Sequence, residues 1–141
     1  MATEIKTVTI EVALPHPCLS PNARAHWAQV SRQKKILREC VANTIRFTRP
    51  ELIDARWPAA RIQYTFYHAV NRDRDDDNYR AMMKAARDAF EPEKINKLGT
   101  VIPGCGLVEN DNDIRDDMPV RFRKCDRERV EITLHKIGAD R

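Results

Sequence analysis

Asp75 and Asp77 stand two positions apart in residues 71–78, one of two acidic segments of the chain, the other being residues 109–117. In an extended segment, side chains two residues apart leave the same face, which would bring these two carboxylates close together. Neighbouring carboxylates repel one another unless they share a cation, and oxygen-only ligands favour a hard ion such as Mg²⁺. A metal held in this way polarises a phosphate and supplies an activated water. The pair therefore predicts a metal-dependent site for cleaving phosphodiester bonds.

Lys84 follows Asp77 by seven residues, so on a helix it returns to nearly the same face two turns along. Because helical side chains lean toward the N-terminus, its ammonium would approach a metal-bound phosphate and offset the charge that builds up there. The alternative is a surface ion pair with Asp88, four residues further on. Asp73 and Asp76 are weaker candidates for metal binding, since a carboxylate is favourable near a helix start in any case.

A calcium-binding loop is the competing interpretation of the same run, because Asp73, Asp75 and Asp77 match positions 1, 3 and 5 of an EF-hand. It fails at position 6, where Asn78 replaces the required glycine, and at position 12, where Lys84 replaces a bidentate glutamate. Other catalytic classes lack their motifs. The chain has no G-x-S-x-G elbow, no glycine-rich phosphate loop and no histidines at metal-ligand spacing.

Hydrophobic periodicity predicts the elements that must position these residues. Apolar side chains alternate in four segments, as in half-buried strands, and recur with a helical period in two others. The expected strands are residues 8–12, 62–66, 118–122 and 130–134, and the expected helices are residues 24–46 and 76–90. A short connection joins the last two strands, which predicts a hairpin. Ser20 or Asn22 would cap the first helix.

The two helices carry apolar stripes that should face the core. The stripes comprise Trp27, Val30, Leu37, Val41 and Ile45 on the first helix, and Tyr79, Met82, Met83, Ala86 and Phe90 on the second. Residues 91–106 have little periodicity and several turn residues, so we expect a long loop insertion that leaves the core. The order of elements predicts one α+β domain over residues 1–141, with a mixed sheet of about four strands packed with two main helices.

Basic residues flank the acidic run, and the formal net charge of the chain is +4 with a pI near 9.0. Basic stretches beside an acidic cluster suit a nuclease, which must hold both phosphates and metal, although a solvated surface would have the same charge balance. The cationic side chains that we expect to contact DNA are Arg24, Arg32, Lys35, Arg38, Arg72, Arg74 and Arg80.

The four cysteines lie far apart and form no C-x-x-C pair, which predicts reduced thiols that serve mainly in packing. No apolar run approaches the roughly 18 residues of a membrane span, and the first residues do not resemble a signal peptide. We therefore expect a soluble, cytoplasmic protein that does not associate with membranes.

Three segments resemble the RusA-like Holliday junction resolvases, a family common in bacteria and prophages. The run Asp75-Asp76-Asp77-Asn78, then Lys84, then Asp88-Ala89-Phe90, resembles the family's D-x-D-N, K and D-x-L signature. The segment 19–24 with His26-Trp27 is similar to the stretch that follows the family's first strand. The segment 106–111 is similar to the apolar stretch that leads to an acidic pair.

This resemblance implies a homodimeric, bacterial or phage-encoded endonuclease that binds four-way DNA junctions and nicks two strands symmetrically. Its cofactor would be Mg²⁺, with Mn²⁺ as a substitute. The implied metal-binding catalytic acids are Asp75, Asp77 and Asp111, with Lys84 as the assisting cation and Asn78 and Asp88 in support. A two-fold dimer suits a substrate with two equivalent strands.

The chain departs from the family pattern at two places. One acid, Asp111, stands where family members often have two, and the connection from Asp88 to Asp111 is longer than usual. Asp113 or Glu109 is therefore an alternative third ligand. Two alternatives for function also stay open: a non-catalytic protein that binds branched DNA, and a nuclease of the same fold that prefers flaps or forks.

Overall fold

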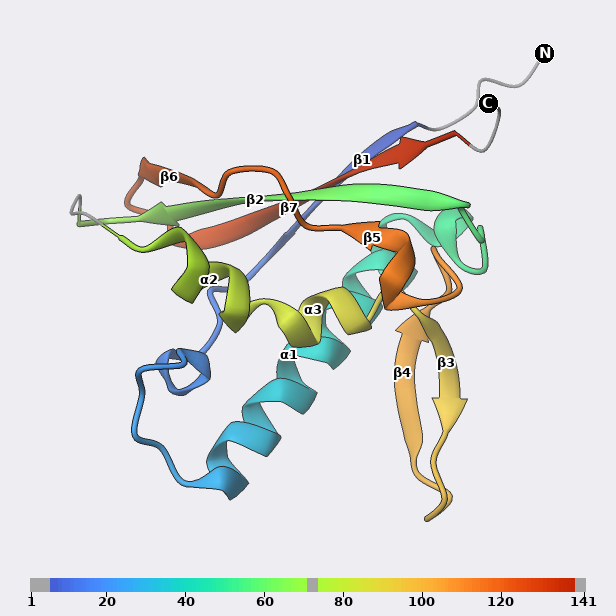
Figure 1. Cartoon of the computed structure of the whole chain (residues 1–141), viewed down its shortest axis with the longest axis horizontal. Coiled ribbons are helices and arrows are strands. Elements are labelled where there is room, and N and C mark those ends of the chain that lie inside the picture. Colours follow the sequence, from blue (N-terminus) through green and yellow to red (C-terminus); the bar gives the residue numbers. More distant parts are fainter. Residues whose placement is uncertain (1–5, 71–73, 139–141) are drawn as a thin grey trace.

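β2 (Ala59–His68) is the longest strand and runs through the middle of a mixed sheet (Figure 1). The structure is a computed structural model, and it describes residues 6–70 and 74–138. β7 (Arg129–Ile137) pairs antiparallel with one edge of β2, and β1 (Thr7–Val12) pairs antiparallel with the far edge of β7. Buried and exposed residues alternate along β1, as the sequence predicts.

Two short strands, β5 (Ile114–Arg115) and β6 (Arg121–Lys124), share the other edge of β2, and both run parallel to it. The sheet thus has five strands, close to the expected four, and the chain is a small α+β domain as predicted. The hairpin expected between residues 118–122 and 130–134 is wrong, because β6 and β7 lie on opposite edges of β2. Residues 62–64 of β2 are buried at consecutive positions, so both faces of the strand are covered there, and its pairing with β7 on one edge and with β5 and β6 on the other makes it central.

The first helix, α1 (Trp27–Thr48), starts three residues later than predicted and covers one face of the sheet (Figure 1). Leu37, Val41 and Ile45 are buried in the core, as expected. Trp27 is not part of the stripe, because its side chain is 76% exposed at the first residue of the helix. The helix ends just before the short 3₁₀ turn Pro50–Leu52.

His26 caps α1, so the expectation that Ser20 or Asn22 does so is wrong. Its Nδ1 accepts a hydrogen bond from the backbone N–H of Ala28 at 3.1 Å. Ser20 instead accepts from the N–H of Asn22 at 3.3 Å, just after the 3₁₀ turn Pro17–Leu19. Asparagine and serine are stronger cap formers than histidine in general, which is why the sequence misplaced the boundary. As a result, Arg24 lies in the loop before the helix.

The second predicted helix is two helices, α2 (Asp76–Met82) and α3 (Lys84–Asp88). They are separated at Met83, where φ is −94° and ψ is 8°, away from the α-helical values. Met83 is fully buried, so packing in the core holds the break in place. The rest of the predicted stripe also faces the core, with Tyr79 packed against its edge.

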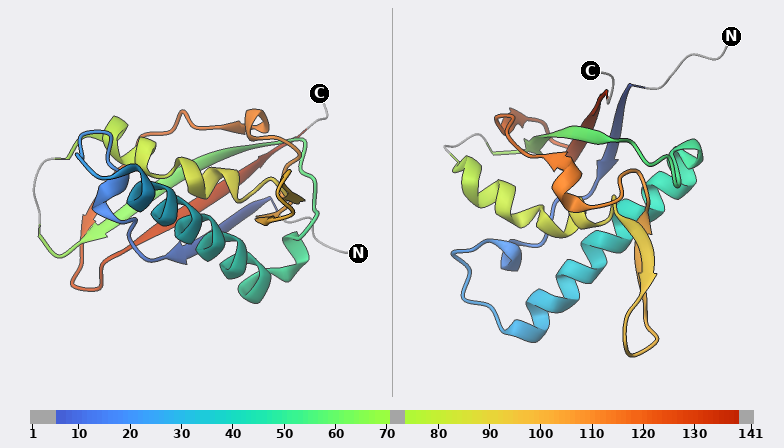
Figure 2. Two further views of the ribbon diagram at one scale, coloured as in Figure 1. Left: turned by 90° about the horizontal axis from the view of Figure 1, so that it is seen from below. Right: turned by 45° about the vertical axis from the view of Figure 1, so that its right-hand side comes forward.

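Residues 91–106, expected to be a loop, contain a β-hairpin that projects from the domain (Figures 1 and 2). Its strands, β3 (Pro92–Ile95) and β4 (Val101–Cys105), form a separate two-stranded sheet. Most residues of the hairpin are exposed, so no alternation of apolar and polar residues reveals it in the sequence. The side chain of Asn96 closes the turn by accepting from the N–H groups of Leu98 and Thr100 at 2.9 Å each.

All four cysteines are free thiols, as predicted. Over residues 6–70 and 74–138, no helix has the length and apolar character needed to cross a membrane.

Candidate functional site

Asp75 is the N-cap of α2. Its Oδ1 accepts hydrogen bonds from the backbone N–H groups of Asp77 at 2.8 Å and Asn78 at 3.3 Å. An aspartate at this position satisfies two amides that have no partner within the helix, and its charge is favourable at the helix start. The extended geometry expected for Asp75 and Asp77 is therefore replaced by a helix start, which places Asp77 in the first turn.

Asp77 points away from the protein, with 92% of its side chain exposed. Nη1 of Arg80 lies 3.2 Å from its Oδ1. Arg80 is itself held at its other nitrogens, by Oδ1 of Asp116 at 2.9 Å and by the carbonyl of Met118 at 2.8 Å. Arg80, predicted to contact DNA, thus makes its hydrogen bonds within the protein.

Asp116 is a nearly buried carboxylate that no sequence pattern indicated. Only 9% of its side chain is exposed, and it binds both Arg80 and Arg87. It lies in the loop that connects β5 to β6, where no hydrophobic pattern in the sequence indicates burial. Asp76 also has a structural role, since its Oδ2 accepts the N–H of Val120 at 3.2 Å. These contacts attach α2 and α3 to the edge of the sheet.

Lys84 contacts two carboxylates. Its Nζ lies 3.6 Å from Oδ1 of Asp88 and 3.9 Å from Oδ2 of Asp111. The ion pair with Asp88 is the alternative that helical spacing predicted. The break at Met83 separates Lys84 on α3 from Asp77 on α2, so the two residues do not share the one continuous helix that was expected. The contact with Asp111 brings together two of the residues in the predicted site.

The loop of Asp111 distinguishes it from the two alternative acids. Asp113 accepts the N–H of Asn110 at 3.2 Å and so caps the short 3₁₀ helix Asp111–Asp113. Glu109 forms an ion pair with Arg56. Of the three acids, Asp111 is the one whose carboxylate contacts Lys84 within the described residues.

Glu91 connects Asp111 with the first helix. Its Oε2 accepts the backbone N–H of Asp111 at 3.2 Å, and its Oε1 lies 4.0 Å from Nη2 of Arg38. Nε of Arg38 donates to the carbonyl of Pro103 in β4 at 2.6 Å. Arg38, predicted to contact DNA, therefore has a structural role between α1, the hairpin and the Asp111 loop.

The other predicted DNA contacts differ in their surroundings. Arg24, Arg32 and Lys35 are exposed, and none of them forms an ion pair with a residue that the structure describes. Arg74 donates to the hydroxyl of Tyr79 and to the carbonyl of Val70, both at 2.8 Å. Arg72 and Asp73 lie outside the described residues.

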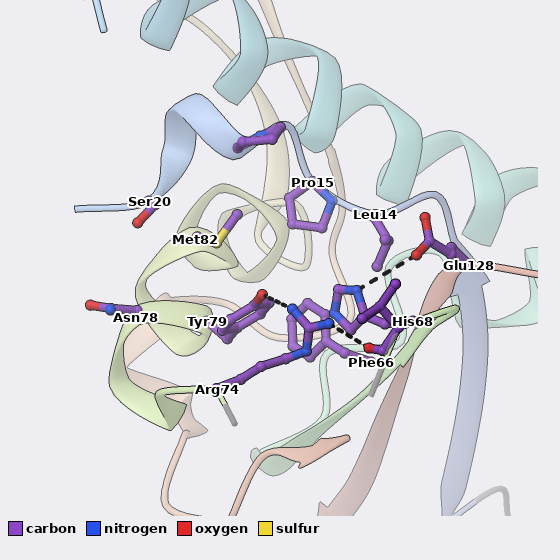
Figure 3. Close-up of a pocket in the computed structure, with 12 residues that line it drawn as sticks. Leu14, Pro15, Ser20, Phe66, His68, Arg74, Asn78, Tyr79, Met82 and Glu128 are labelled. Atoms are coloured by element: carbon purple, nitrogen blue, oxygen red, sulfur yellow. Dashed lines mark hydrogen bonds and ion pairs between the residues drawn. The ribbon is translucent and has the colours of Figure 1, made fainter. Parts of the chain in front are cut away.

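A cavity of about 450 Å³ adjoins the start of α2 (Figure 3). Phe66 and Tyr79, packed edge to face with ring centroids 4.9 Å apart, line it from β2 and α2. Arg74, Asn78 and His68 supply polar groups, and the imidazole Nδ1 of His68 lies 4.0 Å from a carboxylate oxygen of Glu128. Asn78, predicted to support the site, is among the residues that line this cavity, which none of the predicted metal-binding acids lines.

The donor chemistry of the predicted acids fits a hard cation, because Asp75, Asp77 and Asp111 offer carboxylate oxygens. Asp75 and Asp77 share one helical turn, whereas Asp111 lies beside Lys84. In the part of the chain that the structure describes, no three histidine, cysteine, aspartate or glutamate side chains converge on one point suited to a metal. Asp111 would have to approach the other two for all three to share one ion.

The two strongly buried titratable groups near this region are not suited to proton transfer. Burial raises the pKa of the Tyr64 phenol well above its usual value, and the negative charge of Asp116 raises it further. Burial likewise raises the pKa of Cys105 to about 11. Both groups stay protonated at neutral pH, so neither serves as a base there.

No family model and no curated protein matches this chain. The similarity to the RusA-like resolvases therefore rests on the motifs quoted above and stays a prediction.

Proposed function

We propose that this protein is a Mg²⁺-dependent endonuclease that nicks branched DNA at four-way junctions. The observation that carries the proposal is the contact of Lys84 with Asp111, two residues separated by 26 others in the chain and both implied by the family resemblance. Lys84 keeps an ammonium at the surface beside an exposed carboxylate, where a phosphate of DNA can reach both.

Asp75, Asp77 and Asp111 would hold the metal. A bound Mg²⁺ supplies Lewis acidity toward the phosphate and lowers the pKa of a water. In the hydrolysis, the water oxygen forms a bond to phosphorus and the bond from phosphorus to one sugar oxygen breaks, with a proton passing to the leaving oxygen. Lys84 is suited to offset the negative charge that accumulates on the phosphate oxygens. Asp88 and Asp111 hold its ammonium in position.

The test is incubation of labelled four-way junction, fork and linear duplex with the protein, with and without Mg²⁺. The informative variants are Asp75→Asn and Asp111→Asn. Asparagine caps helices as well as aspartate does, so Asp75→Asn removes a charge without removing the cap. Asp126→Asn is the matched control, because Asp126 is exposed in the connection between β6 and β7.

Paired symmetric nicks in the junction, dependent on Mg²⁺ or Mn²⁺, lost in both site variants and kept in the control, would support the proposal. Paired nicks also require two active subunits, so a homodimer should be seen by light scattering. Preferential cutting of the fork would instead indicate a flap or fork nuclease.

The second candidate is a protein that binds branched DNA without cutting it. The observation in its favour is that the three acids do not converge on one point among the described residues. This candidate predicts salt-sensitive junction binding that needs no divalent ion, because phosphate contacts release counterions with or without a metal. Tight binding without any nick in Mg²⁺ or Mn²⁺ would establish it and exclude the nuclease.

A further inference from the structure

A groove with a volume of about 320 Å³ runs between α1, α3 and the β3–β4 hairpin. α1 contributes Lys34, Lys35 and Arg38, α3 contributes Lys84, and the hairpin contributes the opposite wall, including Thr100 and Pro103. Lys84, which contacts Asp111, is therefore part of the wall of the groove.

The charge of the groove is unbalanced. Four cationic side chains and the carboxylate of Asp88 line it, and two of the cations already have partners: Lys84 pairs with Asp88 and Asp111, and Arg38 lies 4.0 Å from Glu91. Lys34 and Lys35 are exposed, and neither forms an ion pair with any residue in the described ranges. Two ammonium groups without a partner among the residues that the structure describes line the same groove, so an anion that enters it would be attracted to both.

The hairpin wall is held in place by α1. Arg38 binds the carbonyl of Pro103, and Nη2 of Arg46 lies 3.6 Å from a carboxylate oxygen of Glu93. Gly104 allows the base of the hairpin to close tightly, since a Cβ there would lie 2.1 Å from the carbonyl oxygen of Glu91. The wall is therefore built before any ligand binds, which reduces the entropy lost on binding.

The shape and chemistry of the groove fit a polyanion with apolar parts. Ala85, Val101 and Ile102 supply apolar surface between the cations, which suits the sugars of a nucleic-acid strand. Lys94 and Lys97 lie exposed on the hairpin and extend the positive charge beyond the groove. Because ammonium groups bind phosphate as point charges, they impose no base sequence.

We infer that this groove holds the sugar-phosphate backbone of one DNA strand next to the cutting site, with the β3–β4 hairpin as its outer wall. The inference rests on the proposed function, and it gives the hairpin of residues 92–105 a role as a DNA-binding element. Lys34 and Lys35 each contact one phosphate, and Lys84 stands where the strand reaches Asp111.

The experiment measures binding of a fluorescein-labelled four-way junction by anisotropy across a range of salt concentrations, without divalent cation so that no strand is cut. Lys34→Gln and Lys35→Gln should each reduce the slope of log affinity against log salt by about 0.7–0.9, the value of one phosphate contact. Lys6→Gln is the matched control, because Lys6 precedes β1 and does not line the groove. It should leave the slope unchanged.

The hairpin wall is tested by adding a carboxylate to it. Thr100→Glu places a negative charge inside the groove and should weaken junction binding by about tenfold at moderate salt. Leu98→Glu adds the same charge to the same hairpin outside the groove, where Leu98 is 89% exposed, and should have a much smaller effect. Equal effects of these two variants would overturn the role of the hairpin as a wall.

The outcomes separate this inference from the proposed function. Normal salt slopes for Lys34→Gln and Lys35→Gln would overturn the groove, even if the unaltered protein nicks junctions in Mg²⁺. Reduced slopes in a protein that never nicks would overturn the nuclease and leave the groove as the DNA-binding surface.

Discussion

The carboxylate of Glu91 accepts a hydrogen bond from the backbone N–H of Asp111, with 3.2 Å between Oε2 and the nitrogen. Glu91 stands at the base of the hairpin and also lies within 4.0 Å of Arg38 on α1. One side chain therefore joins the first helix, the hairpin and the loop that carries Asp111. In this arrangement, Glu91 is a positioning residue for the proposed third metal ligand.

Glu91→Ala should lower the nicking rate and raise the Mg²⁺ concentration needed for half-maximal nicking, because the Asp111 loop loses its anchor. Glu91→Gln retains an acceptor oxygen and should recover most of the activity. The measurement is the Mg²⁺ dependence of single-turnover nicking for both variants. A purely structural role would reduce the folded fraction in both and leave the Mg²⁺ midpoint unchanged, which would contradict the prediction.

The two roles of Asp75, as the helix cap and as a proposed metal ligand, can be tested separately. Asp75→Ala removes the side-chain acceptor for two amides and should lower the free energy of unfolding by about 1 kcal/mol, whereas Asp75→Asn should leave it nearly unchanged. Both variants should lose nicking, because neither has a charged ligand at this position. Urea denaturation and junction nicking, measured on the same preparations, check the two effects. Full nicking by Asp75→Asn would show that the residue is only a cap.

The sequence predicted correctly those elements in which the spacing of apolar residues matches the residues that are buried. The alternation in β1 and the stripe Leu37, Val41 and Ile45 in α1 both face the core as expected. The prediction from sequence failed where the structure depends on which strands pair with one another. β6 pairs with β2 and not with the nearby β7, and a sequence pattern does not show which of two edges a strand will occupy.

The same limit applies to the candidate site. The ion pair of Lys84 with Asp88 follows from helical spacing, and the structure contains it. The contact of Lys84 with Asp111 depends on how a long excursion returns to α3, which local patterns do not encode. The sequence pointed to Asp111 through the motif resemblance alone. Asp116 gave no signal, because its burial arises from the position of its loop against Arg80 and Arg87.

The cysteines should differ in reactivity according to their surroundings. A hydrogen bond from the backbone of Arg127, supported by the guanidinium of Arg129, lowers the pKa of Cys125, whereas burial raises that of Cys105 to about 11. Because the thiolate is the reactive form, iodoacetamide at mildly alkaline pH should modify Cys125 well before Cys105. Mass spectrometry of quenched samples measures the order. In denaturant the two rates should become similar, and a difference that persists there would contradict this explanation.

The raised pKa of Cys105 also predicts a loss of stability at high pH. The thiol in the unfolded chain ionises near its ordinary value of 9.0, but the folded protein keeps its proton until about pH 11. Between these values the unfolded state binds fewer protons, so stability falls as pH rises. The full stabilising contribution of the buried, protonated Cys105 thiol is present below about pH 9. Urea midpoints for the unaltered protein and for Cys105→Ala should converge as the pH rises from 8 to about 10.5, and a constant difference would contradict the prediction.

Replacing Asp116 should destabilise the protein strongly, although the residue lies outside the predicted site. Its carboxylate is nearly buried and binds two arginines, so Asp116→Ala leaves Arg80 and Arg87 without their shared counter-ion. Removing one partner of a buried ion pair costs about 3–5 kcal/mol, and partial exposure of both arginines favours the lower end. Asp126→Ala, an exposed acid in a nearby connection, should change stability by at most about 0.5 kcal/mol. Urea denaturation of both variants measures the difference. Equal unfolding free energies would mean that the guanidinium groups find water or other partners, and that Asp116 does not fasten α2 and α3 to the sheet.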